Sequence, residues 1–322
     1  MSVLVVVEHD RGQMVDATLE AFAFAVDIAA QGDIAVEALV IGQDAAGLAD
    51  ECAAHGASVV HHVTDAALTD YGPDAYGAVV AAAVTALEPS ALVASGSDRG
   101  NEVLAWAAGE LDLPFVANCL SVKVADDWEM TRVQWGGSLN EDARLASSMP
   151  IVSVAPHAID AAPVAAGAVA VVHPMTVSLP ASVTATTIQD RIIMSEGVTL
   201  ATAPVVIGGG RGVGSAEGFD VLEALAAKLG GVVGCSRAVT NNGWRPHADQ
   251  VGQTGTRIAP QLYIACGISG AIQHWVGAKA AKKILAINTD SAANMVVKAD
   301  FEIIGDLFDV LPAITDAITD AC

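Results

Sequence analysis

The feature that most constrains the fold is a regular alternation of short apolar runs with longer helical patterns. Runs rich in Val, Ile and Ala predict strands, and each is followed by a segment with the apolar spacing of a helix. The strands are expected at Ser2–Glu8, Ile34–Ile41, Ser58–Val63 and Ala91–Ala94, and the helices at Val15–Ala30, Ala45–His55, Pro73–Leu87 and Asn101–Leu111. Such an order predicts a doubly wound parallel sheet.

The stretch Phe115–Val154 departs from this alternation. It contains short β-like runs, a turn at Asp126-Asp127 and the sequence Trp135-Gly136-Gly137. Short strands joined by tight turns are typical of hairpins. Antiparallel strands are therefore expected in this part of the chain.

A linker is expected next, followed by a second domain. The segment Ala158–Val198 is rich in Ala, Val and Pro, and Asp160–Pro163 resembles the start of a linker. We place the boundary near Glu196, which gives an N-terminal domain over residues 1–195 and a C-terminal domain over residues 196–322. Strands and helices alternate again in the second domain and predict another parallel α/β unit: strands at Ala203–Ile207, Val232–Cys235, Leu262–Cys266, Lys283–Ile287 and Phe301–Ile304, and helices at Phe219–Leu229, Gly270–Val276 and Val310–Ile318.

The composition is that of a folded protein with room for two domains. The chain has 322 residues, of which 53% are hydrophobic and 16% charged, so it can bury a core. No uninterrupted apolar run reaches about 18 residues, so no transmembrane helix is expected. The segment Met1–Glu8 shows neither a basic leader nor an Arg/Ser-rich transit pattern, which predicts a cytoplasmic protein.

The net charge is −22 at pH 7, and it is unevenly spread along the chain. Residues 1–195 hold 25 acidic and 6 basic side chains, whereas residues 196–322 hold 12 acidic and 9 basic ones. A strongly acidic surface disfavours binding to nucleic acid. Residues 196–322 have nearly as many basic as acidic side chains, which suits the binding of an anionic ligand there.

The cysteines predict neither a zinc site nor an iron–sulfur site. They are odd in number, far apart and free of any C-x-x-C spacing. We expect them to be buried, inert thiols: Cys52, Cys119, Cys235, Cys266 and Cys322.

The first motif with chemical meaning is the glycine-rich run Gly208–Ser215, between a predicted strand and a predicted helix. Glycines let the backbone approach a phosphate closely, and a helix N-terminus offers free N–H groups. Arg211 within the run can pair with a pyrophosphate. The run lacks the Lys-Ser/Thr of a P-loop and only approximates the dinucleotide-binding fingerprint.

The second motif, Ser236-Arg237, ends the next predicted strand. The carboxyl ends of strands line the ligand crevice of a doubly wound sheet. An arginine there can meet an anion or an electron-rich ring. The same arrangement is also how an NADP-dependent dehydrogenase binds a 2′-phosphate, so this alternative stays open.

Further polar loops follow the later strands of the second domain. They are Gln250–Gly255, Gly267–His274, Ala286–Asp290 and Gly305–Phe308. Ser269-Gly270 at a predicted helix start forms a second anion cradle. Two cradles and several polar strand ends together suggest one long ligand that crosses the edge of the sheet.

Taken in order, these motifs resemble the alpha subunit of electron-transfer flavoproteins. The resemblance covers about 110 residues of the second domain, and it rests on these runs: Gly-Gly-Arg-Gly, Ser-Arg-Ala, Gln-Val-Gly-Gln-Thr-Gly, Gly-Ile-Ser-Gly-Ala-Ile-Gln-His, Ala-Ile-Asn and Asp-Leu-Phe. The first domain resembles the family more loosely, through Thr131-Arg132 and Gly136-Gly137. The resemblance implies an N-terminal adenine-nucleotide-hydrolase-like sheet and a C-terminal DHS-like NAD/FAD-binding domain.

The resemblance also implies which residues hold the phosphates and the adenosine end of FAD. The pyrophosphate is expected against Arg211, Ser236 and Ser269. The phosphate–ribitol stretch is expected against Asn288, and the adenosine end against Asp306-Leu307.

The flavin end follows from the same resemblance. Gln253 and Thr254 are expected to reach the ring, with the Thr254 hydroxyl near N5. Arg237 is expected on the isoalloxazine ring and His274 opposite the C2 carbonyl. Reduction adds negative charge near N1 and O2, which a cationic Arg237 and a His274 that can become cationic would stabilise. The expected FAD site also includes Gly267, Gly270, Ala271, Ile272 and Gln273.

The implied function is electron transfer without substrate chemistry. The resemblance implies a heterodimer with a beta subunit that carries AMP and is contacted by the N-terminal domain. It implies electron donors such as acyl-CoA dehydrogenases of fatty acid β-oxidation, and a membrane quinone oxidoreductase as acceptor. An NADP-dependent oxidoreductase and a non-redox adenine-nucleotide-binding protein remain as alternatives.

Overall fold

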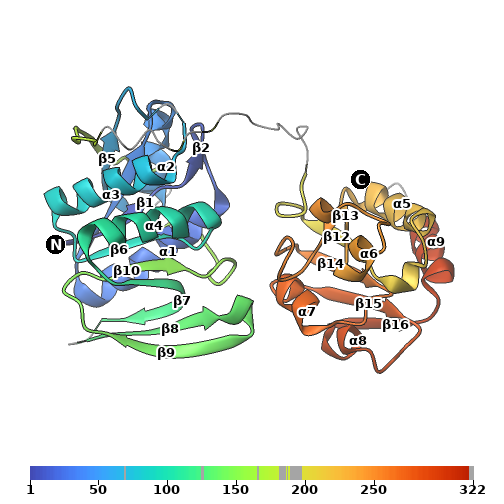
Figure 1. Cartoon of the computed structure of the whole chain (residues 1–322). Coiled ribbons are helices and arrows are strands. Elements are labelled where there is room, and N and C mark those ends of the chain that lie inside the picture. The colour runs from blue at the N-terminus through green and yellow to red at the C-terminus, as the bar shows by residue number, and fades with distance from the viewer. Residues whose placement is uncertain are drawn as a thin grey trace. The chain divides into compact units, whose positions relative to one another are not determined.

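A computed structural model describes residues 1–68, 70–124, 127–164, 167–180, 186, 188 and 198–318. The chain forms two compact units, Met1–Trp135 with Leu139–Ile192, and Gly136–Ser138 with Ile193–Cys322. Each unit is a sheet with helices on both faces (Figure 1). Glu196, near which we predicted the domain boundary, lies outside the described residues.

The N-terminal unit is built on a nine-stranded sheet of order β11-β5-β4-β1-β6-β10-β7-β8-β9. Its pairs are parallel except β7–β8 and β8–β9, which are antiparallel. The strands are β1 Ser2–Val6, β4 Ala35–Ile41, β5 Ala57–Val63, β6 Ala91–Ser95, β7 Phe115–Lys123, β8 Trp128–Gln134, β9 Leu139–Leu145, β10 Ile151–Val154 and β11 Val171–Met175. A small hairpin of β2 (His9–Asp10) and β3 (Gln13–Met14) follows β1. The predicted doubly wound parallel sheet is therefore confirmed.

Within the described residues, four α-helices cover the faces of this sheet. One core cluster contains buried residues of α1 (Asp16–Gly32) and α2 (Ala49–Ala54), and the other contains those of α3 (Pro73–Leu87) and α4 (Asp98–Leu111). The start of α3 follows from Pro73, whose fixed φ suits the first turn of a helix. The start of α4 follows from Ser97, whose hydroxyl accepts the backbone N–H of Gly100 at 2.8 Å.

Two expectations for the middle of the chain were wrong in part. The Ala/Val/Pro-rich segment predicted as a linker contains β11, which pairs in parallel with β5. Pro174 lies within β11, and proline is tolerated there because β11 is an edge strand. The stretch predicted as antiparallel ends in β10, which pairs in parallel with β6 and β7. Asp126 of the predicted turn lies outside the described residues.

The crevice at the carboxyl ends of β1 and β6 is filled by the protein's own side chains. The chain runs outward from β1 to β4 and β5 on one side and to β6 on the other, so the strand order reverses here. Glu8 follows β1, and its carboxylate accepts hydrogen bonds from Ser95 (2.6 Å) and Ser97. The cavity that remains measures about 20 Å³, which is room for about one water molecule.

The C-terminal unit has a five-stranded parallel sheet of order β13-β12-β14-β15-β16. The strands are β12 Val205–Gly209, β13 Val232–Cys235, β14 Leu262–Cys266, β15 Ile284–Asn288 and β16 Phe301–Ile304. One core cluster contains buried residues of α5 (Asp220–Leu229), α6 (Arg237–Asn241) and α9 (Leu307–Ala317), and the other contains those of α7 (Ile272–Ala278) and α8 (Asn294–Lys298). The second predicted parallel α/β unit is confirmed.

None of the helices that the structure describes combines the length and the hydropathy required of a membrane span.

Candidate functional site

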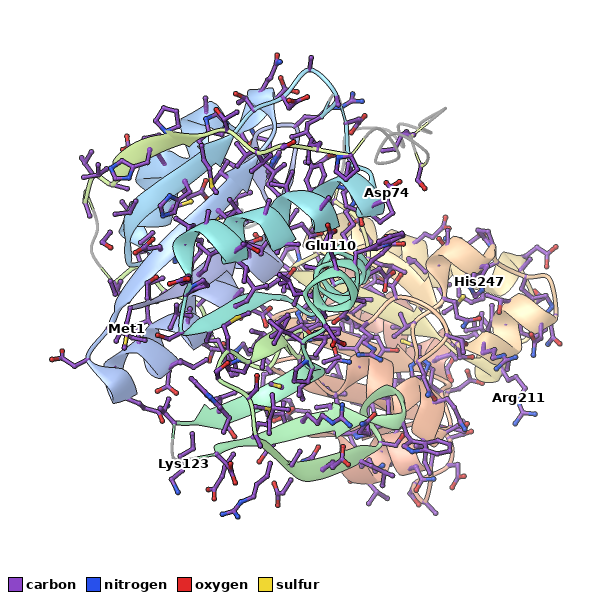
Figure 2. The ribbon with its side chains drawn as sticks, turned by 60° about the vertical axis from the view of Figure 1, so that its left-hand side comes forward. Met1, Asp74, Glu110, Lys123, Arg211 and His247 are labelled. Carbon is purple, nitrogen blue, oxygen red and sulfur yellow. The ribbon has the colours of Figure 1, made fainter. Side chains whose placement is uncertain are left out.

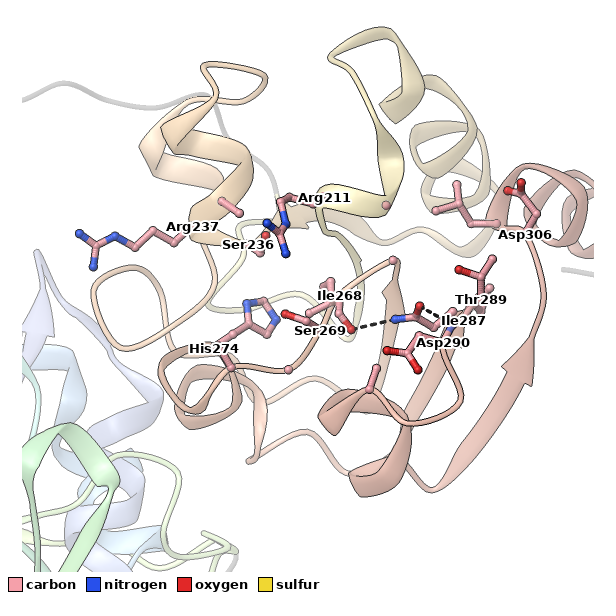
Figure 3. Close-up of a pocket in the computed structure, with 18 of the residues that line it drawn as sticks. Arg211, Ser236, Arg237, Ile268, Ser269, His274, Ile287, Thr289, Asp290 and Asp306 are labelled. Atoms are coloured by element: carbon pink, nitrogen blue, oxygen red, sulfur yellow. Dashed lines mark hydrogen bonds between the residues drawn. The ribbon is translucent and has the colours of Figure 1, made fainter.

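A cleft of about 620 Å³ lies at the carboxyl edge of the C-terminal sheet (Figure 3). The chain turns from β12 to β13 on one side and reaches β14 on the other, so the strand order reverses beside β12. Ligands of open α/β sheets bind at such a reversal. The residues around the cleft follow all five strands: Arg211, Gly212, Ser236, Arg237, Ala238, Asn241, Gly267, Ile268, Ser269, Gly270, Ala271, Gln273, His274, Ile287, Asn288, Thr289, Asp290, Ala293, Gly305, Asp306, Leu307 and Phe308.

Glycines hold the loops after β12 and β14 in close contact. The backbone N–H of Gly210 donates to the Cys266 carbonyl at 2.8 Å, and that of Gly212 donates to the Gly267 carbonyl at 3.1 Å. A Cβ built on Gly212 would lie 2.7 Å from the Gly267 Cα, closer than real Cβ contacts come. The first glycine-rich motif is thus explained by backbone packing at the floor of the cleft.

A second contact joins the loop after β14 to the segment after β15. Gly270 has φ +76°, and a Cβ on it would lie 2.3 Å from the Met295 backbone nitrogen. Asn288 donates through Nδ2 to the Ile268 carbonyl at 3.1 Å and accepts from the Asp290 N–H at 3.1 Å. The Asn288 amide therefore fixes both loops and keeps one N–H and one lone pair for a ligand.

Two arginines at the cleft have guanidinium groups without a protein partner. Arg211 and Arg237 are exposed, and neither guanidinium makes a hydrogen bond or an ion pair within the part of the chain that the structure describes. Figure 2 shows the Arg211 side chain projecting outward, and in Figure 3 Arg237 extends away from the other labelled residues. Arg245 in the same unit differs, since it pairs with Glu223 and with Asp249 at 2.8 Å. The two unpaired guanidinium groups are available to an anion.

His274 places an imidazole in the wall of the cleft. It is 6% exposed, and Nε2 lies 2.8 Å from the hydroxyl of Tyr263. Nδ1 has no hydrogen-bond partner among the described residues. Burial lowers the pKa of His274 to about 4, and the nearby Val251 carbonyl offsets only part of this effect. The expectation of a readily cationic His274 is therefore wrong for this structure, in which the ring is neutral near pH 7.

Three predicted site residues do not line the cleft. Gln253 and Thr254 lie in the loop before β14, where the Gln253 N–H donates to the Gln273 carbonyl at 2.8 Å. Ile272 opens α7 and is 61% exposed. All the other predicted residues line the cleft.

Gln250 is a structural partner of this loop and is not among the residues predicted for the site. It is buried, donates through Nε2 to the Thr254 hydroxyl at 3.0 Å, and accepts from the Thr240 hydroxyl at 2.8 Å. Its position inside the motif Gln250–Gly255 was the one available signal. Gln250 therefore orients Thr254.

Some lining residues had no individual role in the sequence analysis. Thr289, Asp290 and Phe308 belong to the polar loops Ala286–Asp290 and Gly305–Phe308, which were expected to meet the ligand, but no role was assigned to these three side chains. Phe308 comes from the first turn of α9 and is 42% exposed. Asn241, which ends a helix of five residues after β13, lines the cleft without any sequence signal of its own.

The cleft fits a dinucleotide such as FAD. Its floor is a glycine cradle that a Cβ would fill, its rim carries unpaired arginines, and its wall holds the unpartnered Nδ1 of His274. Cleft volumes of about 300–1,000 Å³ are usual for cofactors and ligands. Phosphates suit the cradle and the arginines, and a ring with polar edges suits the histidine.

The cysteines of the described residues are buried and unbridged, as expected. Burial raises the pKa of Cys52, Cys119, Cys235 and Cys266 to about 12, so each is a neutral thiol near pH 7. Cys322 lies outside the described residues. No group of three His, Cys, Asp or Glu side chains suited to a metal ion occurs in the described ranges.

Comparison with known proteins agrees with this geometry. Residues 199–279 match the electron transfer flavoprotein FAD-binding domain, and residues 3–179 match the electron transfer flavoprotein domain. Electron transfer flavoprotein subunit alpha of Pseudomonas aeruginosa is 35% identical over 99% of this chain and 100% of its own length. The protein of the same name from Bacillus subtilis is 33% identical over 98% of this chain and 96% of its own. Protein FixB of Bradyrhizobium diazoefficiens is 35% identical over 98% of this chain and 88% of its own length. The chain therefore belongs to the alpha-subunit family of electron transfer flavoproteins.

Proposed function

We propose that this chain binds FAD in the cleft of its C-terminal unit and works as an electron carrier without substrate chemistry of its own. The observation that carries the proposal is the cleft at the strand-order reversal, with its glycine cradle, unpaired arginines and unpartnered His274 Nδ1. The match of residues 199–279 to an FAD-binding domain supports it.

The roles of the residues follow from their chemistry. Arg211, Ser236 and Ser269 hold the pyrophosphate, since they place cationic and hydroxyl groups around the cradle. Asn288 uses its spare N–H and lone pair on the phosphate–ribitol stretch, and Asp306-Leu307 binds the adenosine end.

The ring end is bound from the other side of the cleft. FAD, when bound, supplies reversible one- and two-electron redox chemistry. Arg237 and His274 present a positive charge and a polar edge to the ring. Gln253 and Thr254 belong to the adjoining loop and reach the ring from there.

We further propose that the chain acts as the alpha subunit of a heterodimer. Its relatives are named as alpha subunits, which implies a beta subunit as partner. In this proposal residues 1–195 contact the beta subunit, which carries AMP, and residues 196–322 carry FAD. The heterodimer takes electrons from flavin dehydrogenases such as acyl-CoA dehydrogenases and hands them to a membrane quinone oxidoreductase. We expect it in the cytoplasm.

The non-redox alternative finds little room at the strand-order reversal of the N-terminal sheet. Glu8, Ser95 and Ser97 fill the crevice in which such a sheet would hold a nucleotide. A neighbouring hollow of about 180 Å³ is smaller than the about 300–1,000 Å³ usual for ligand sites.

The proposal is tested by purifying the co-expressed heterodimer and measuring its absorption spectrum, its FAD content and its AMP content. We expect a flavin spectrum and one FAD for each alpha chain. A colourless protein that binds NADP would replace the proposal with the dehydrogenase alternative. If a fragment of residues 1–190 retained FAD, the proposed position of FAD in the cleft would be wrong.

A further inference from the structure

Tyr263 and His274 form a buried pair behind the cleft. Tyr263 lies within β14, is 0% exposed, and is among the largest fully buried side chains. Its hydroxyl lies 2.8 Å from the Nε2 atom of His274, and the two ring centroids are 6.1 Å apart. In the part of the chain that the structure describes, the Tyr263 hydroxyl has this one hydrogen-bond partner.

The direction of this hydrogen bond follows from what each group can offer. A buried hydroxyl proton without an acceptor costs about 1–3 kcal/mol. If Nε2 carried a proton, the phenol oxygen would have to accept it, and the phenol's own proton would be left unpaired. The buried pair is satisfied when the Tyr263 hydroxyl donates and Nε2 accepts.

The second ring nitrogen must then carry the proton of the neutral imidazole. The hydrogen bond made by one ring nitrogen decides which nitrogen is protonated. Nδ1 is buried and makes no hydrogen bond within the described residues, although the Val251 carbonyl lies near the ring. An N–H left without an acceptor there is costly unless a ligand completes it. His274 lines the cleft, and in Figure 3 its imidazole points from the start of α7 toward Ser269.

We propose that Tyr263 is a positioning residue that holds His274 as the Nδ1–H tautomer, so that a neutral N–H donor faces the ligand in the cleft. The inference rests on the proposed function in one respect, because it names the polar edge of the flavin as the acceptor of that N–H. A donor there binds the reduced ring more tightly than the oxidised ring, since reduction adds negative charge to that edge. Tyr263 thus influences the redox balance without touching the cofactor.

Gly208 of β12 is the third member of this arrangement. A Cβ built on Gly208 would lie 2.2 Å from the Tyr263 hydroxyl oxygen and 2.7 Å from the adjacent ring carbon. Gly208 is paired with Ala265 of β14, two residues after Tyr263, so Gly208 and Tyr263 lie on the same face of the sheet. Glycine at this position leaves the space through which the hydroxyl reaches His274.

The test uses the co-expressed heterodimer with ¹⁵N-labelled histidine, before and after removal of flavin. The His274 signal is assigned by its loss in His274→Ala. In the wild type at pH 7 we expect a bare Nε2 and a protonated Nδ1. In Tyr263→Phe both nitrogens should move to averaged positions, because the two tautomers then interconvert. A wild-type Nε2 that carries the proton, or an unchanged tautomer in Tyr263→Phe, would overturn the inference.

A second readout is the midpoint potential of the bound flavin, which reports the ratio of affinities for reduced and oxidised ring. Tyr263→Phe should lower this ratio by about 3–10-fold, the range expected for one hydrogen bond. Tyr76→Phe, which removes a phenol hydroxyl from the N-terminal unit, is the matched control and should change it less than about twofold. Equal effects of the two variants would contradict the inference.

If Tyr263→Phe does not fold, 3-fluorotyrosine at position 263 keeps the size and makes the phenol a stronger donor. The Nε2 signal should then move toward the protonated position, and an unmoved signal would overturn the inference. The outcomes also separate the two proposals. If the Nδ1–H tautomer depends on Tyr263 but the protein does not bind flavin, only the proposed function is contradicted. If flavin is bound but Nε2 carries the proton, only this inference is contradicted.

Discussion

Gly210 lies so close to Gly267 that a Cβ built on Gly210 would be 2.2 Å from the Gly267 carbonyl oxygen. The two loops cannot keep their contact if either position carries a side chain. The floor of the cleft is therefore set by backbone against backbone.

Gly210→Ala should separate these loops and reduce FAD occupancy of the purified heterodimer by at least about tenfold, which corresponds to about 1.4 kcal/mol of binding free energy. Absorbance at the flavin band against protein content measures this. Gly109→Ala is the control, because a Cβ there meets nothing within 4 Å and the position lies on helix α4. Full occupancy in Gly210→Ala would show that the cradle does not hold the cofactor.

Arg237→Ala should lower the flavin potential by tens of millivolts while FAD still binds. A cation about 4 Å from a unit negative charge gains roughly 4 kcal/mol at an effective dielectric of about 20, and exposure to solvent reduces this to about 1–2 kcal/mol. A change of about 1.4 kcal/mol corresponds to about 59 mV for one electron. Arg237→Lys should keep part of the effect, because the charge stays while the planar stacking surface is lost.

Spectroelectrochemical titration of the heterodimer measures these potentials. Lys228→Ala is the matched control, because Lys228 is in the last turn of α5, which leads to the start of β13 at the opposite edge of the sheet. The control removes the same charge and should leave the potential unchanged. If Arg237→Ala leaves the flavin potential unchanged, Arg237 does not contact the ring, and its role is that of a surface or phosphate-binding residue.

Much of this site could be predicted because its residues follow apolar strands directly. Parallel strands bring their carboxyl ends to one edge, so the sequence alone predicts that Arg211, Ser236 and Ser269 lie together. The periodicity of longer helices was equally plain. The five-residue helices α6 and α8 were missed, because five residues carry too little periodicity to be distinguished from a loop.

The remaining features depend on contacts that no local pattern encodes. Gly270 is needed because Met295 approaches it from a later segment of the chain. The neutral state of His274 comes from burial beside Tyr263, which neither residue reveals alone. The edge strand β11 was predicted as part of a linker, because a short segment with few apolar residues and Pro174 is compatible with a linker as well as with an edge strand.

Gln250→Leu should destabilise the C-terminal unit by about 1–3 kcal/mol, since the Thr254 hydroxyl loses its buried partner. The flavin should also bind more weakly, because the loop that holds Thr254 is no longer fixed. Urea unfolding and FAD titration measure the two effects. Gln261→Leu, at an exposed position of the same unit, should change neither. Equal stability of the two variants would show that the Gln250 hydrogen bonds contribute nothing.

The buried carboxyl group of Glu20 should make the folded protein less stable as the pH rises. Burial raises the pKa of Glu20 from 4.5 to about 7, and the N–H of Ala158, which donates to its carboxylate at 3.2 Å, offsets only part of this. The folded protein therefore binds this proton more tightly than the unfolded chain does. The stabilisation is complete below pH 4.5 and is lost as the pH rises through about 7.

Glu20→Gln should flatten this dependence, since the amide keeps an oxygen for the Ala158 N–H and cannot ionise. Urea unfolding of the heterodimer at several values between about pH 5 and pH 8 gives the comparison. Glu110→Gln, at an exposed carboxylate on α4, is the control and should keep the wild-type slope. A Glu20→Gln slope equal to that of the wild type would place the titration elsewhere.

The position of the Glu8 carboxylate implies that the stabilities of the two units depend differently on the cellular supply of FAD. Binding of FAD adds RT ln(1 + [FAD]/Kd) to the stability of the unit that binds it, about 2.7 kcal/mol at a hundredfold excess over Kd. The crevice of the N-terminal sheet is already filled by Glu8, so its stability owes nothing to any such supply. In a cell short of riboflavin, proteases should therefore attack the chain beyond residue 198 first and leave the N-terminal half as a lasting fragment.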